Sequence, residues 1–139
     1  MPKWTCPECH RQFAKKGQQH SCATKPLKDH FTNKLEAYKL FQLLLKKIEL
    51  QIGKIKILSI PCCIHLYGSY DFMAILPKMK GVLELRFALD HTLKNKRIFA
   101  SVPISSTSHK NCLRITSAID IDAELLGWLK QSYSMHVKE

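Results

Sequence analysis

The sequence predicts an α+β fold. A small cysteine-rich module precedes an antiparallel sheet of about five strands, with a long helix before the sheet and a C-terminal helix after it. Three Cys and two His lie within residues 6–22, apolar residues then recur at helical spacing, and from residue 54 onward the apolar pattern alternates as strands do. We therefore expect a module at residues 1–25 and an α+β domain at residues 26–139.

The cysteine-rich module has the ligand spacing of a structural zinc site. Cys6 and Cys9 form a C-x-x-C turn with both sulfurs on one side, and His20 and Cys22 complete a set of four. A closed tetrahedral Zn²⁺ site requires four such ligands. A thioredoxin-type redox pair would need a strand before the C-x-x-C turn, and only five residues precede it. We predict structural Zn²⁺ on Cys6, Cys9, His20 and Cys22, with iron as the other metal to be distinguished.

The H-x-C spacing limits what this zinc knuckle can do. Residues two apart on a helix point to nearly opposite sides, so His20 and Cys22 cannot both reach a metal from one regular helical turn. This spacing argues against the helix-borne fingers that read base pairs in the major groove. Phe13 is expected to form the small core of the knuckle, with stacking on an exposed base as the alternative.

An amphipathic helix is predicted over residues 33–52. Its apolar stripe advances by three and four residues, through Leu35, Tyr38, Phe41, Leu45, Ile48 and Ile52. Asn33 followed by Glu36 fits an N-cap with a capping box, and Gly53 fits the position just past the C-terminal end.

Successive strands are predicted after this helix, joined by short turns that imply antiparallel neighbours. They are expected at residues 55–57, 63–67, 70–76, 83–89, 97–102 and 110–116. A second capping signal, from Ser117 to Asp120, introduces a final helix that packs on the sheet. Gly127 lies inside that helix, where glycine costs about 1 kcal/mol relative to alanine, so we expect it to mark a close helix contact.

Positive charge is concentrated on the middle of the chain. The formal net charge is +11, and residues 34–114 carry 14 Lys and Arg against 5 Asp and Glu. A field of this sign attracts polyanions, which favours nucleic acid or an acidic membrane surface as partner. The residues expected to contact nucleic acid are Arg11, Lys15, Lys16, Arg86 and Arg114. The alternative is a well-solvated basic protein with no polyanion partner.

The sequence also favours a cytoplasmic location without membrane insertion. No apolar stretch of signal-peptide length precedes the cysteine-rich module, and the longest apolar runs are far shorter than the roughly 20 residues of a membrane helix. A reducing cytosol disfavours disulfides. The expected location therefore agrees with metal binding by the clustered Cys and His.

The sheet face that the helices leave open is a second candidate site. Its expected lining includes His65, Asp71, Glu84, Arg86, His109 and Arg114, and His65 or His109 could act as acid or base in a ligand pocket. The alternative is an ordinary solvated face of mixed charge. Cys62 and Cys63 are not expected to bind one metal together, because adjacent side chains leave a strand on opposite faces. Both are interpreted as small buried residues, and Cys112 likewise. The sequence contains no Gly-rich phosphate loop or nucleophile elbow, so no motif supports an enzyme.

Several segments resemble a family of bacterial proteins. They are Trp4-Thr5-Cys6-Pro7, Arg11-Gln12-Phe13, His20-Ser21-Cys22, Pro26-Leu27 with His30-Phe31, and Ile121 to Leu129 near the end of the chain. Members of this family have a zinc-knuckle head on a small α+β domain of unknown function. The resemblance implies this architecture and no particular reaction.

Three functions remain open at this point. The first is a nonenzymatic nucleic-acid-binding or regulatory protein in which zinc is structural. The second is a small enzyme or ligand-binding domain that uses the polar sheet face. The third is a protein-interaction adaptor whose N-terminal end is ordered by zinc and contacts a protein partner. The substrate, the target sequence and the oligomeric state do not follow from the sequence.

Overall fold

The computed structural model describes residues 4–13, 15–20 and 22–137, and it has the predicted α+β architecture. A two-stranded sheet near the N-terminal end consists of β1 (Trp4–Thr5) and β2 (Gln12–Phe13). The other strands are β3 (Lys56–Ile60), β4 (Cys63–Tyr67), β5 (Asp71–Pro77), β6 (Leu83–Leu89), β7 (Ile98–Ser105) and β8 (Ser108–Ile115). They form a six-stranded antiparallel sheet in the order β3-β4-β5-β6-β8-β7, which matches the six expected strand ranges.

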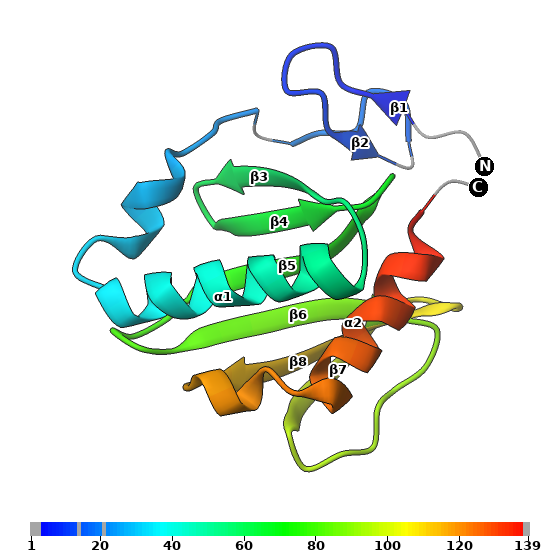
Figure 1. The fold of residues 1–139 in the computed structure, drawn as a ribbon. Helices are drawn as coiled ribbons and strands as arrows, with labels where there is room; N and C mark the ends of the chain where they lie inside the picture. The colour runs from blue at the N-terminus through cyan, green and yellow to red at the C-terminus, as the bar shows by residue number, and fades with distance from the viewer. Residues whose placement is uncertain (1–3, 14, 21, 138–139) are drawn as a thin grey trace.

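Both α-helices lie over the same face of the six-stranded sheet (Figure 1). They are α1 (Leu35–Gln51) and α2 (Ala123–Met135), preceded by the short 3-10 helices η1 (Leu27–Phe31) and η2 (Ala118–Asp120). The apolar core lies between this face and the helices, and its largest fully buried side chains include Phe41, Leu44, Ile48, Phe72, Phe87 and Leu113. Among the described residues, no helix is both long enough and apolar enough to cross a membrane.

The start of α1 differs from the prediction, and the predicted capping box is wrong. Asn33 has a left-handed φ of 59°, and Lys34 occupies the N-cap position without a side-chain hydrogen bond. The N–H of Ala37 instead donates to the carbonyl of Lys80 at 2.9 Å, in the turn between β5 and β6. A tertiary contact therefore supplies one of the acceptors that a capping side chain would provide.

The C-terminal end of α1 is held by α2. Gly53 follows the helix as predicted, and its N–H donates to the carbonyl of Ile48 at 3.1 Å. Tyr133 of α2 donates its hydroxyl to the carbonyl of Lys54 at 2.8 Å. A Cβ added at Gly53 would lie 2.6 Å from the Tyr133 hydroxyl oxygen, so the absent side chain permits this approach.

Capping interactions precede both η2 and α2. Ser117 and Asp120 form a capping box at η2, and Asp122 then caps α2 by accepting a hydrogen bond from the N–H of Leu125 at 2.9 Å. The expectation for Gly127 is wrong, because a Cβ added there would meet nothing within 4 Å. Gly127 is exposed and mediates no close helix contact.

Candidate functional site

The four predicted ligands Cys6, Cys9, His20 and Cys22 converge in the N-terminal segment. Their ligand atoms all lie within 4.8 Å of one another. The sulfurs of Cys6 and Cys22 are 3.7 Å apart, and the Nε2 atom of His20 is 3.3 Å from the sulfurs of both Cys9 and Cys22. Metal–sulfur bonds of about 2.3 Å in a tetrahedral site hold two sulfurs about 3.8 Å apart. The cluster is therefore spaced to hold one metal ion.

Local hydrogen bonds shape this cluster. The N–H of Cys6 donates to the carbonyl of Arg11 at 2.9 Å, and the N–H of His10 donates to the carbonyl of Cys6 at 2.8 Å, which closes the C-x-x-C loop. The Nδ1 atom of His20 lies 2.7 Å from the carbonyl oxygen of Gln18. A carbonyl only accepts, so the proton is on Nδ1 and the Nε2 lone pair faces the sulfurs, as in a metal-binding histidine.

The cysteine pKa values differ within the cluster. Backbone N–H groups of Cys9 and Glu8 favour the thiolate of Cys6 and lower its pKa to about 6. Desolvation by burial, together with the sulfurs of Cys6 and Cys9, raises the pKa of Cys22 to about 12. The protein thus stabilises one negative sulfur and opposes a second, and a divalent cation at the centre would remove that repulsion.

Aromatic rings pack around the ligand histidine and connect the cluster to the six-stranded sheet. The ring centroid of Phe13 is 4.1 Å from that of His20, and the Trp4 ring is 6.1 Å from both. The guanidinium of Arg11 lies 5.1 Å from the Phe13 centroid. Burial raises the pKa of Tyr67 on β4, and a hydrogen bond from Arg11 opposes that rise. Phe13 therefore packs among aromatic rings in the N-terminal segment, and Arg11 links this segment to β4.

The two sheet arginines expected to bind nucleic acid share one carboxylate. Arg86 Nη2 is 2.6 Å from one oxygen of Glu84, and Arg114 Nε is 3.3 Å from the other. Burial would raise the pKa of Glu84, but hydrogen bonds from both arginines lower it below its usual value. Arg114 stays largely exposed and lies 4.5 Å from the ring centroid of Phe99. One carboxylate opposes two guanidinium groups, so this patch keeps a positive charge.

The two candidate histidines lie on opposite faces of the sheet. His65 pairs with Ala74, which in turn pairs with Arg86, so these residues share the open face. His109 pairs with Leu89, which is fully buried on the face under the helices. The expectation that both histidines line one open face is therefore wrong. His109 and Arg114 lie five residues apart on β8, and this odd spacing places their side chains on opposite faces of the sheet.

Cys62, Cys63 and His65 form a second Cys/His cluster. The expectation that both cysteines are buried is wrong for Cys62, which is exposed in the turn Pro61-Cys62 between β3 and β4. Its side chain is outside the strand alternation, and the two sulfurs lie 2.8 Å apart. The Cys63 sulfur is 3.1 Å from His65 Nε2. The three ligand atoms lie within 4.8 Å of one another. Cys112 is buried as predicted.

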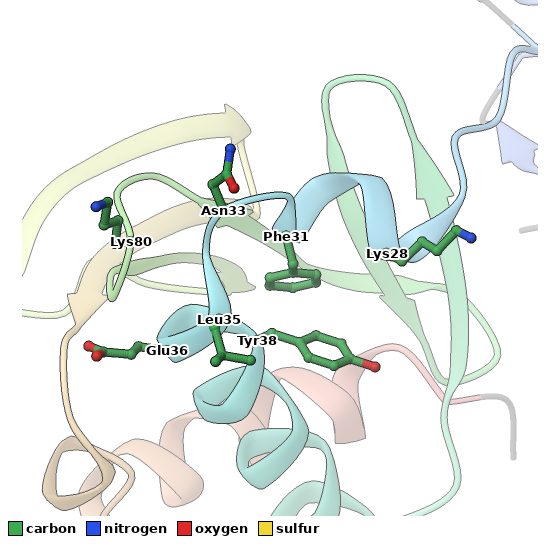
Figure 2. A pocket seen from close by; sticks show the side chains of 7 residues that line it. All are labelled: Lys28, Phe31, Asn33, Leu35, Glu36, Tyr38 and Lys80. Carbon is green, nitrogen blue, oxygen red and sulfur yellow. The ribbon is translucent and has the colours of Figure 1, made fainter.

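A pocket of about 700 Å³ lies where η1 meets the start of α1 (Figure 2). Phe31, Leu35 and Tyr38 give it an apolar wall, and Lys28 and Lys80 lie on opposite sides of it (Figure 2). Sequence reasoning placed Leu35 and Tyr38 on the helix stripe and assigned no role to Phe31. It could not identify the pocket, because Lys80 comes from the distant β5–β6 turn.

A smaller pocket of about 230 Å³ is basic. Its lining includes Lys25, Lys34 and Lys78 against one acidic residue, Asp29. His30 also lines it and is 7% exposed, and its Nε2 atom has no hydrogen-bond partner among the described residues. Burial and the charges of Lys25 and Lys34 lower the pKa of His30. Sequence reasoning missed this pocket because its lysines come from three separate segments.

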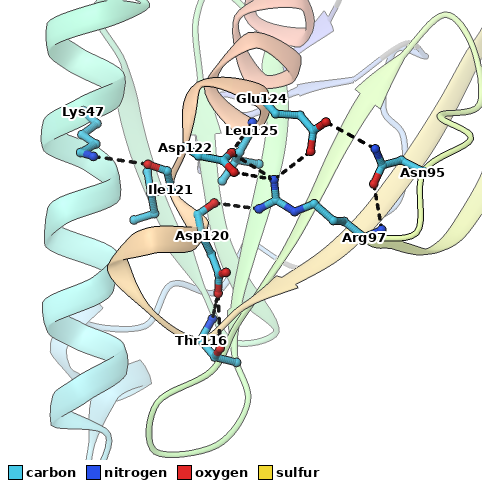
Figure 3. Close-up of polar contacts among 9 residues, drawn as sticks. All are labelled: Lys47, Asn95, Arg97, Thr116, Asp120, Ile121, Asp122, Glu124 and Leu125. Carbon is cyan, nitrogen blue, oxygen red and sulfur yellow. Dashed lines mark hydrogen bonds and ion pairs between the residues drawn. The ribbon is translucent and has the colours of Figure 1, made fainter.

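Arg97 fastens the β6–β7 connection to the start of α2 (Figure 3). Its Nη1 atom lies 3.0 Å from Asp122 and 3.1 Å from Glu124, and its Nη2 atom donates to the carbonyl of Asp120 at 2.7 Å. The guanidinium also lies 5.7 Å from the ring of Trp128. Arg97 is therefore held by ion pairs and a hydrogen bond within the fold, whereas Lys15 and Lys16 are exposed.

Comparison with protein families gives a match to the α+β part of the chain. The model of a family described as a domain of unknown function (DUF5655) matches residues 27–136. The matched region includes both α-helices and the six-stranded sheet, and the N-terminal Cys/His cluster lies outside it. Comparison with curated proteins and with solved structures gives no match.

Proposed function

We propose that this chain, which belongs to the DUF5655 family, a domain of unknown function, is a zinc-stabilised, nonenzymatic nucleic-acid-binding protein. The family supplies no activity, so the proposal is argued from the candidate sites. The observation that carries this proposal is the convergence of Cys6, Cys9, His20 and Cys22 within 4.8 Å. Thiolate and imidazole are the ligands of structural zinc, and four protein ligands leave no position for a substrate. The zinc is therefore proposed to order the N-terminal segment.

Exposed cations support a polyanionic partner. Lys15 and Lys16 lie exposed in the loop between the two ligand pairs. On the open sheet face, Arg114 lies over Phe99, which is 50% exposed. An exposed aromatic ring beside a cation is a surface on which single-stranded nucleic acid stacks, because every base has a π-face and every linkage a phosphate. We propose that the loop lysines contact phosphates and that the Phe99 surface contacts bases.

Metal analysis of the purified full chain tests the zinc proposal. We expect the N-terminal cluster to bind one zinc ion, and Cys22→Ser to lose it, because three ligands remain where four are needed. Cys112→Ser is the matched control, since Cys112 is a buried thiol outside both Cys/His clusters. Zinc retained equally by Cys22→Ser and the control would contradict this assignment.

Fluorescence anisotropy with random single-stranded DNA, duplex DNA and RNA tests the partner. Affinity should fall steeply as salt rises, because phosphate contacts release counterions. The double variant Lys15→Gln/Lys16→Gln should weaken binding and flatten the salt dependence, whereas Lys130→Gln, an exposed lysine on α2, should have little effect. Undetectable binding to all three probes at low salt would end the nucleic-acid proposal.

A second candidate function is the binding of a small anion, favoured by the basic pocket. Lys25, Lys34 and Lys78 surround a buried His30 whose Nε2 atom is without a partner among the described residues. Calorimetric titration with inorganic phosphate should detect binding that Lys78→Gln weakens. Lys80→Gln is the matched control, because Lys80 lines the other pocket. Equal affinity in both variants would exclude phosphate binding in this pocket.

A further inference from the structure

We propose that Cys62, Cys63 and His65 form a second metal site, which binds a thiophilic divalent ion such as Zn²⁺ and leaves one coordination position open. This site is separate from the N-terminal cluster and does not depend on the proposed function. Its three ligand atoms lie within 4.8 Å of one another at the end of the β3–β4 hairpin.

The hairpin brings these ligands together through its own geometry. Cys63 and His65 are two residues apart on β4, so both side chains leave the strand on the same face. Cys62 occupies the turn before the strand, where its side chain is free to return over that face. A turn residue followed by alternate strand residues thus supplies three ligands from one short segment.

Asp71 completes the arrangement from the neighbouring strand β5. Its carboxylate oxygen lies 2.7 Å from the Nδ1 atom of His65. This is a close ionic contact without hydrogen-bond geometry, since Nδ1 has no hydrogen-bond partner among the described residues, and it leaves the Nε2 atom 3.1 Å from the Cys63 sulfur. A carboxylate behind a histidine orients the ring and increases its basicity, and metal-binding histidines almost always have such a partner.

The coordination would be incomplete without a further ligand. Two thiolates and one imidazole are the protein ligands of some catalytic zinc sites, in which water or substrate takes the fourth position. Cys63 is 7% exposed, whereas Cys62 is exposed and also lines the basic pocket beside Lys25 and Lys78. The open position therefore borders solvent and a pocket that suits anions.

The two sulfurs have to separate when the ion binds. They lie 2.8 Å apart, and a tetrahedral ion with metal–sulfur bonds of about 2.3 Å requires about 3.8 Å. Rotation of the exposed Cys62 side chain in its turn can supply this movement of about 1 Å without disturbing the buried Cys63. The competing outcome is a disulfide between the adjacent cysteines, which would remove both thiolates.

Cobalt titration of the full reduced chain distinguishes these outcomes. We expect two Co²⁺ ions per chain, both with thiolate-to-metal absorption. Cys62→Ser and His65→Ala should each bind one. Cys112→Ser and His109→Ala, matched controls outside the cluster, should still bind two. A Cys62→Ser variant that binds as many Co²⁺ ions as the wild-type chain would overturn the proposal.

The same titration separates this inference from the proposed function. Cys22→Ser removes a ligand of the N-terminal cluster alone, so its remaining ion should be lost when Cys62→Ser is added. If the N-terminal cluster bound no metal, the wild-type chain would bind one Co²⁺ that Cys62→Ser abolishes and Cys22→Ser preserves. That result would refute the zinc knuckle and support the hairpin site.

Asp71→Asn tests the positioning role of the carboxylate. The variant keeps all three ligands, so it should still bind two Co²⁺ ions. Loss of the partner behind a metal-binding histidine typically weakens affinity by about 10- to 100-fold. Competition with a chelator should show that loss at the hairpin site and none at the N-terminal cluster. Unchanged affinity at both sites would exclude the positioning role.

Discussion

The N-terminal segment and the six-stranded domain differ in what they bury. Among the described residues before Pro26, Cys6 is the single buried hydrophobic side chain, and it is also a candidate metal ligand. From Phe31 onward the chain buries a continuous apolar core that includes Phe41, Phe72 and Phe87. Chains below about 40 residues rarely bury enough apolar surface to fold alone and usually need metals, disulfides or partners. The two regions are therefore expected to depend on different conditions.

This difference has a thermodynamic consequence. In a metal-dependent segment the free energy of metal binding is also the free energy of folding, so chelators, oxidants and acid act on it directly. In the six-stranded domain the stability depends on packing, so cavities and lost caps act on it. Perturbations that separate these responses test whether the two regions are independent.

Metal removal should have the largest effect. Structural zinc in finger peptides contributes about 10–16 kcal/mol of apparent binding free energy at neutral pH, far more than aromatic packing around His20 can replace. After EDTA treatment of the full chain, NMR amide signals from the described residues before Pro26 should collapse toward random-coil positions. Signals from β5, β6 and β8 should persist. An N-terminal segment that keeps its dispersed signals without metal would show that its fold does not depend on a metal ion.

A cavity in the apolar core should give the reverse pattern. Phe41 is 1% exposed in α1, and removing a buried phenylalanine side chain costs about 3–5 kcal/mol. Urea unfolding of zinc-loaded Phe41→Ala should show this loss in the six-stranded domain, whereas zinc content below the transition should be unchanged. Leu50→Ala is the control, because Leu50 is 74% exposed. Zinc loss in native Phe41→Ala would show that the two regions are coupled.

The sequence predicted most of the elements because their signals are local. Helical spacing from Leu35 to Ile48 and alternation in β6 each arise from one continuous segment, and both elements are present. The cysteine spacing likewise identified four side chains that the structure brings together. Periodicity and ligand spacing are both properties of short stretches, so a single sequence is enough to recognise them.

Predictions failed where a distant segment decides the outcome. The capping box at Asn33 is wrong because Asn33 has a left-handed φ and precedes the N-cap residue Lys34, and the carbonyl of the distant Lys80 accepts from the N–H of Ala37. The misplacement of His109 is of another kind, because its odd spacing from Arg114 on β8 already places the two side chains on opposite faces. Cys62 was treated as a strand residue, and the turn that frees its side chain was not recognised. Long-range register and turn geometry are what one sequence without relatives leaves undetermined.

Acid should reveal a smaller contribution confined to the six-stranded domain. The N–H of Leu125 and the guanidinium of Arg97 lower the pKa of Asp122 below its ordinary value. The carboxylate therefore stabilises the fold above the unfolded-state pKa, and this contribution is lost as pH falls through the lower folded-state pKa. Asp122→Ala should lower the free energy of unfolding by about 1 kcal/mol at pH 7. Urea unfolding should show that this loss becomes smaller below about pH 4, where the wild-type carboxylate also becomes protonated.

The control for this experiment is Asp90→Ala. Asp90 also has a lowered pKa, because His91 donates a hydrogen bond to it, but it lies in the connection after β6 and caps no helix. It should change the free energy of unfolding less than Asp122→Ala at pH 7. A pH-independent cost for Asp122→Ala would indicate lost packing in place of a lost charge and cap.

The smallest effect should be a gain, from Gly127→Ala. Gly127 is an exposed interior residue of α2, and an added Cβ would meet nothing within 4 Å. Alanine in a helix interior is favoured over glycine by about 1 kcal/mol, because glycine loses more backbone entropy on folding. The urea midpoint of the six-stranded domain should rise, and Co²⁺ affinity at the N-terminal cluster should not change.

Gly53→Ala provides the opposing control. Its added Cβ would lie 2.6 Å from the Tyr133 hydroxyl oxygen, so the substitution should destabilise the junction of α1 and α2. If both substitutions destabilised the domain, Gly127 would have a packing role after all. If Gly127→Ala also altered metal affinity, α2 and the N-terminal segment would be energetically coupled, and the two regions would not be independent.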